Sequence, residues 1–151
     1  MELSDLKNIF NRIHEASENE KQDIIDDFLK NNNDLSFLAS SGNSHFSYYS
    51  AMIISFIGFP NIKGLFPEIL EWLQDLNWPG VYEIIETLKK ADKEFILPHI
   101  ENTLEQAIAE KDEMWIGGIK ILVELMNISK NDFPNKEIYE MLELSDYHIL
   151  A

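Results

Sequence analysis

Acidic side chains recur at helical spacing near the middle of the chain, and they are the residues best placed to do chemistry. Glu68, Glu71 and Asp75 follow one another at i, i+3 and i+7, which would put three carboxylates on one helix face. Such a face can be simply solvated, can hold a metal ion, or can bind Lys and Arg side chains of a basic partner. The spacing alone leaves these three interpretations open.

A second group of candidate residues lies on the next helical segment. Its apolar residues recur with helical period and predict a buried face, made by Val81, Ile84, Ile85 and Leu88. The opposite face then carries Tyr82, Glu83 and Glu86. Tyrosines are enriched among the residues that dominate interface energies, although Tyr82 can equally be an ordinary exposed tyrosine. The predicted partner-binding residues are therefore Glu68, Glu71, Asp75, Tyr82, Glu83 and Glu86.

The sequence contains no recognisable catalytic or metal-binding pattern. The string that begins at His14 resembles a zinc-protease helix, but Glu18 occupies the position of the required second histidine. No Glu-x-x-His pair, nucleophile elbow or phosphate-binding glycine loop occurs, and cysteine is absent. We therefore expect no catalytic residue, no metal, no cofactor and no enzymatic activity.

The charge of the chain restricts its partners. With 27 acidic and 12 basic residues among 151, the formal net charge is −15. Nucleic acids and anionic membranes attract basic proteins, so both are disfavoured as partners, whereas a basic protein is favoured. The N-terminus shows no secretory signal, and the apolar stretch 51–60 is too short to span a bilayer. We expect a cytoplasmic protein.

Helical periodicity dominates the chain and no convincing strand pattern appears. Leu6, Ile9, Phe10 and Ile13 predict a first helix, and the capping-box spacing from Ser17 to Glu20 predicts the start of a second. A third helix is expected over residues 45–57, after a cap at Ser44. Residues 35–67 contain one base and no acid. The segment Phe46–Phe59 is therefore either a central buried helix or an exposed interface.

Apolar–proline elements recur along the second half of the chain. Pro67 and Pro98 are 31 residues apart, and Pro134 follows 36 residues later. Each is expected to open or kink the first helix of a pair, with second helices over 81–90 and 116–126. Helix pairs that recur every 30–40 residues are typical of an α-solenoid. We therefore predict an all-α protein, a short solenoid of antiparallel helix pairs. Residues 1–151 would form one domain, with the repeats over about 65–151 and helices over about 1–60 packed on them.

The string EWLQDLNWP at residues 71–79 is distinctive. With the preceding Pro67, it resembles the core motif of a family of small bacterial helical domains of unknown function. The resemblance continues at residues 97–100 and 112–115, and spans about 65–126. It departs from the family pattern after Trp115, where Gly117 and Gly118 replace further aromatics. We expect that helix to pack more closely on a neighbour.

The resemblance implies a fold of HEAT-like repeats and similarity to immunity proteins that accompany secreted bacterial toxins. The resulting expectation is an immunity protein that binds and neutralises a basic cytotoxic effector by occlusion. The alternative is an intracellular adaptor whose solenoid binds a protein or peptide. Trp78 and Trp115 are expected in the core, and the position of Trp72 is left open.

Overall fold

The computed structural model describes residues 3–39 and 48–143, and within them the chain is all-helical. No strand occurs in these ranges, and none of their helices is long and apolar enough to cross a membrane. The α-helices are α1 (Leu3–Glu15), α2 (Glu18–Asn31), α3 (Tyr48–Ile57), α4 (Phe66–Leu70), α5 (Val81–Leu88), α6 (Lys93–Ala109), α7 (Glu113–Leu125) and α8 (Lys136–Glu143). Short 3-10 helices are η1 (Ser36–Leu38), η3 (Lys63–Leu65), η4 (Glu71–Gln74) and η5 (Lys130–Asp132).

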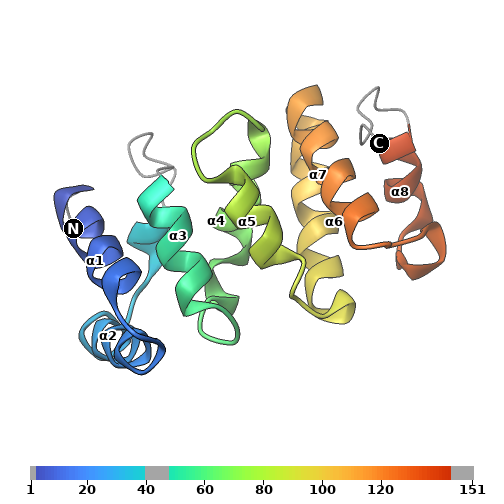
Figure 1. Cartoon of the computed structure of the whole chain (residues 1–151). Coiled ribbons are helices and arrows are strands. Elements are labelled where there is room, and N and C mark those ends of the chain that lie inside the picture. Colours follow the sequence, from blue (N-terminus) through green and yellow to red (C-terminus); the bar gives the residue numbers. More distant parts are fainter. Residues whose placement is uncertain (1–2, 40–47, 144–151) are drawn as a thin grey trace.

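Helices close in sequence pack against one another along the molecule. In Figure 1 they follow one another across the molecule in chain order, and α6 lies behind α7. The helix α3 packs between α1 and α5, α4 packs on α6, and α8 contacts both α6 and α7. The turn η4 packs against α7 and so joins the middle of the chain to its later part.

Side-chain caps begin two of the helices. The hydroxyl of Ser17 accepts the backbone N–H of Glu20 at 3.3 Å, which confirms the predicted start of α2. The carboxylate of Asp112 accepts the N–H of Trp115 at 3.0 Å and begins α7. Asp92 holds the same position before α6, but its side chain makes no capping hydrogen bond.

The uncharged helix α3 is largely buried. Its buried residues are Ser50, Ala51, Ile53, Ile54 and Ile57. Residues 48–57 thus match the first of the two alternatives, a central buried helix, whereas Phe46 and the expected Ser44 cap lie outside the described residues. One edge of α3 still reaches the surface, where Tyr48 is 40% exposed.

The three repeated prolines, each expected to open or kink a helix, occupy different places. Pro67 lies in the first turn of α4, where a missing N–H costs no helical hydrogen bond. Pro98 lies inside α6, which begins five residues earlier at Lys93. Pro134 precedes α8, which begins at Lys136.

Two tryptophans lie in the core and fix the turn between α4 and α5 against α7. Trp72 and Trp115 are almost fully buried. The indole N–H of Trp72 donates to the Pro79 carbonyl at 3.2 Å, and that of Trp115 donates to the Leu70 carbonyl at 3.1 Å. Trp78 is half-buried and packs against the core, so its predicted core position is confirmed only in part. Trp72 occupies the interior of this turn and leaves Trp78 at its edge.

The predicted close approach of the glycine-containing helix is confirmed. A Cβ atom added at Gly118 would overlap the carbonyl oxygen of Leu73 and lie 3.0 Å from its Cβ. Both Gly117 and Gly118 are buried. The absence of a side chain therefore lets α7 pack directly on the backbone of η4.

Candidate functional site

The structure separates the first three predicted acids. The helix α4 ends at Leu70, and the chain tightens into η4, so an α-helical face does not continue through Asp75. Asp75 has extended backbone angles, φ −146° and ψ 111°, and its carboxylate accepts the N–H of Asn77 at 2.8 Å. The prediction that Glu68, Glu71 and Asp75 share one helix face is therefore wrong for Asp75.

Glu68 and Glu71 instead belong to a cluster with Glu110, the residue that follows α6, and we call these three the acid cluster. Burial raises the pKa of Glu71, and the negative charges of Glu68 and Glu110 raise it further. The Oε2 atom of Glu68 is buried and has no hydrogen-bond partner in the described part of the chain. Sequence spacing could not reveal Glu110 as a neighbour, because α5 and α6 intervene in the chain.

The predicted surface of α5 is present. Its apolar face is buried as expected, at Val81, Ile84, Ile85 and Leu88. Tyr82 is 73% exposed, and Glu86 is exposed beside Lys89, with 3.2 Å between Oε1 and Nζ. Glu83 is half-buried rather than fully outward. An exposed tyrosine next to two acids offers an apolar contact and negative charge to a partner.

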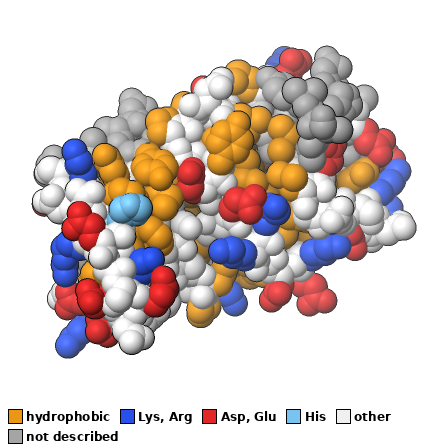
Figure 2. Space-filling model, in the orientation of Figure 1, with side chains coloured by type: hydrophobic (Ala, Val, Ile, Leu, Met, Phe, Trp, Pro, Cys, Tyr) orange, Lys and Arg blue, Asp and Glu red, His pale blue; other side chains and the backbone are white. Residues whose placement is uncertain are grey.

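Aromatic rings also gather between α1 and α3, where Tyr48 and Tyr49 belong to the uncharged segment that the sequence left open as a buried helix or an interface. The ring of Phe10 lies 5.6 Å from His14, 5.7 Å from Tyr48 and 5.4 Å from Tyr49, measured between centroids. On the face shown in Figure 2, hydrophobic side chains gather over α1 and α3 and again over the upper part of α5 toward α7. We call the group around Phe10 the aromatic cluster.

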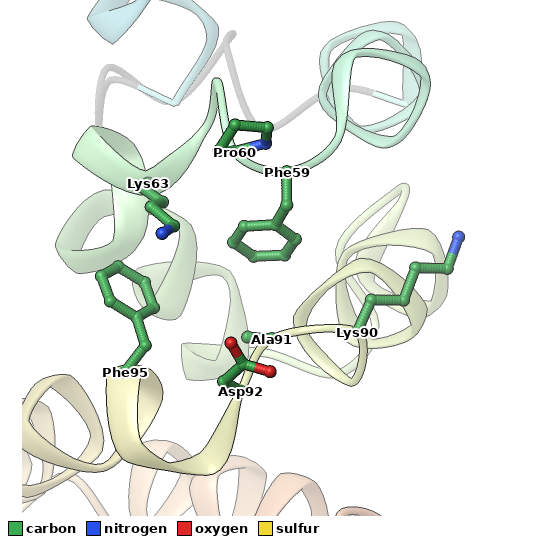
Figure 3. A pocket seen from close by; sticks show the side chains of 7 residues that line it. All are labelled: Phe59, Pro60, Lys63, Lys90, Ala91, Asp92 and Phe95. Carbon is green, nitrogen blue, oxygen red and sulfur yellow. The ribbon is translucent and has the colours of Figure 1, made fainter.

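A small cavity lies between two connections of the chain. It has a volume of about 220 Å³ and is lined by Phe59, Pro60, Lys63, Lys90, Ala91, Asp92 and Phe95. These residues come from the connection after α3, from η3, from the connection after α5, and from the first turn of α6 (Figure 3). Sequence patterns could not reveal this cavity, because the residues of its two walls are some thirty positions apart in the chain.

The described residues include no group of three His, Cys, Asp or Glu side chains that could hold a metal ion. The arrangement offers surfaces for binding: an acid cluster, an exposed tyrosine beside two acids, an aromatic cluster and a cavity with both charges.

Comparison with known proteins assigns a family but no activity. No curated protein and no solved structure matches the chain significantly. One family model matches residues 51–145, well over half of the chain, from α3 to the end of α8. The matched region holds the acid cluster, Tyr82 and the cavity, whereas α1 lies outside it. The chain belongs to this family, which is described as a domain of unknown function, DUF5071.

Proposed function

We propose that this chain is an immunity protein that binds a basic cytotoxic effector and neutralises it by covering its working surface. The observation that carries the proposal is the acid cluster. The charges of Glu68 and Glu110 act there on Glu71, whose pKa is raised, and Glu68 has a buried oxygen that finds no donor among the described residues. The net charge of −15 means that the molecule as a whole also attracts basic partners.

A cationic side chain from the partner would relieve the strain in this cluster. An arginine or lysine of the partner would donate to the accessible parts of the half-buried Glu68 and Glu71 carboxylates and offset the mutual repulsion of the acids. The pKa of Glu71 would then fall, so binding would release a proton wherever Glu71 is partly protonated. The exposed Tyr82, with Glu83 and Glu86, would provide a second contact.

The fold that would present these groups is a short HEAT-like α-solenoid within a single domain. Its support is the packing order: α3 contacts the helices on either side, α4 packs on α6, and α7 and α8 follow. In such an arrangement each added pair of helices covers the apolar face of the pair before it.

Protection in cells tests the proposed function. The protein encoded beside this chain's gene would be expressed in a bacterial host with and without the chain, and growth would be measured. We expect Glu68→Gln with Glu71→Gln, and separately Glu83→Lys with Glu86→Lys, to weaken protection. Each should slow association with the purified effector tenfold or more, roughly 1.4 kcal/mol.

The matched control removes two exposed acids from α2, Asp23→Asn with Asp27→Asn, and should keep full protection. Association of the unaltered chain should also slow as salt screens the opposite charges. Equal protection by both site variants and the control would contradict the use of these surfaces. A neighbouring protein that neither harms the host nor binds the chain would contradict the immunity role.

The second candidate is an adaptor that binds a peptide or protein without any toxin, and the aromatic cluster favours it. The rings around Phe10 lie beside α3, which has no charged residue, so they suit an apolar partner segment. In that case Phe10→Ala would weaken capture of partners from the native host, whereas the acid variants would not. Mass spectrometry of the captured proteins would distinguish the two roles.

A further inference from the structure

The cavity of Figure 3 lies between the connection that follows α3 and the connection that follows α5. Its volume of about 220 Å³ is below the ~300–1,000 Å³ typical of sites for drug-sized ligands. It is therefore suited to a molecule about the size of one amino acid.

Two phenylalanine rings form its apolar walls. Phe59 and Phe95 are both half-buried, and each packs against the fully buried Phe66, at centroid distances of 5.3 and 4.9 Å. Because Phe66 holds both rings from the core side, they form a fixed wall against which an aromatic or branched ligand side chain can pack.

One positive and one negative group face the same cavity. The ammonium of Lys63 lies 5.1 Å from the centroid of the Phe95 ring, which fixes it at one wall. The carboxylate of Asp92 points into the cavity from the other side, whereas the amine of Lys90 points away (Figure 3). Lys63 and Asp92 are not among the ion pairs formed by residues 3–39 and 48–143.

The position of Asp92 is informative because it would ordinarily be used for capping. Aspartate before a helix usually accepts a backbone N–H of the first turn, as Asp112 does at α7. Asp92 precedes α6 without making that bond. Its carboxylate is therefore available to a ligand in the cavity.

We propose that this cavity binds a free α-amino acid with an aromatic side chain. The ligand's ammonium would pair with Asp92, its carboxylate would accept from Lys63, and its side chain would pack on Phe59 and Phe95. A ligand with a single charge would leave either Asp92 or Lys63 unpaired. This site is separate from the acid cluster and does not depend on the proposed immunity role.

The test compares ligands that lack one of the two charges or the ring. Their binding to the full chain would be measured by NMR titration. The probes are L-phenylalanine, 3-phenylpropionate, which lacks the ammonium, phenethylamine, which lacks the carboxylate, and L-alanine, which lacks the ring. We expect phenylalanine to bind in the millimolar range, as suits so small a ligand. The three analogues should bind about tenfold more weakly or worse.

Two variants test the assignment of each charge. Asp92→Asn should abolish the preference for phenylalanine over 3-phenylpropionate, and Lys63→Met should abolish the preference over phenethylamine. Neither should change the melting temperature greatly, since Asp92 does not cap α6, and Asp27→Asn on α2 is the matched control.

Three outcomes would overturn the proposal. The first is no saturable binding of phenylalanine up to its solubility limit, and the second is equal binding of phenylalanine and both singly charged analogues. The third is preferences that persist unchanged in Asp92→Asn and Lys63→Met. None of these results bears on protection from an effector, so the two proposals fail independently.

Discussion

Substitution of Gly118 by alanine tests the direct packing of α7 on η4. The added Cβ would overlap the Leu73 carbonyl oxygen and lie 3.1 Å from the carbonyl carbon. These are backbone atoms and cannot turn aside as a side chain would, so α7 must move away from η4. The same interface holds the hydrogen bond from the Trp115 indole to the Leu70 carbonyl, which this movement would stretch.

The size of the effect follows from three contributions. Overpacking of a tight core contact costs about 1–3 kcal/mol, or more where backbone must shift. Weakening of the Trp115 hydrogen bond adds about 0.5–1.5 kcal/mol, while alanine gains about 1 kcal/mol over glycine as a helix former. The net expectation is a loss of about 0.5–3.5 kcal/mol, which in a domain of this size lowers the melting temperature by about 1–14 °C.

Thermal and urea unfolding, followed by circular dichroism, would measure this change. The control is Gly64→Ala in η3, where an added Cβ has no atom within 4 Å, and it should be neutral or slightly stabilising. If Gly118→Ala and Gly64→Ala were both as stable as the unaltered chain, the described contact between α7 and Leu73 would be refuted.

Three further predictions concern single side chains. Trp72→Ala should lower the free energy of unfolding by about 3–5 kcal/mol, because it removes a fully buried aromatic side chain, and Trp78→Ala should lower it clearly less, because Trp78 is half-buried. Denaturant unfolding would rank the two variants, and the reverse order would contradict the burial described. Because the pKa of Glu71 is raised, the protonation of this carboxyl stabilises the folded chain at low pH, and this stabilisation is lost as the pH rises through the folded pKa. Glu71→Gln should therefore stabilise the chain at neutral pH and reduce its gain in stability on acidification. Melting temperatures measured across pH 4–8 would test both effects. Asp112→Ala should cost about 0.5–2 kcal/mol through loss of the α7 cap, whereas Asp92→Ala should cost much less, and equal losses would contradict the difference in capping.

Local sequence patterns determined the helices and their buried faces. The period of Val81, Ile84, Ile85 and Leu88 was sufficient to predict the inward face of α5 and the exposure of Tyr82. The same holds for the Ser17 cap, which depends on residues three positions apart. These features could be predicted because each depends on contacts within one or two turns of helix.

The departures arose where packing overrode the local pattern. The carboxylates at 68, 71 and 75 have helical spacing, but the chain tightens at Glu71 into a 3-10 turn that buries Trp72. That turn separates Asp75 from the other two acids and leaves Trp78 at the edge of the core. Spacing alone cannot anticipate such a break, because the burial of Trp72 depends on α7, which lies forty residues further along.

The candidate sites divide in the same way. The sequence by itself determined the excess of acids, the lack of a catalytic pattern and the outward position of Tyr82. Only the tertiary structure decided that Glu110 joins Glu68 and Glu71, and that Lys63 and Asp92 face one cavity. Residues from separate helices meet only when the apolar faces of those helices pack together, and the resulting geometry is set by side-chain packing rather than by any local repeat.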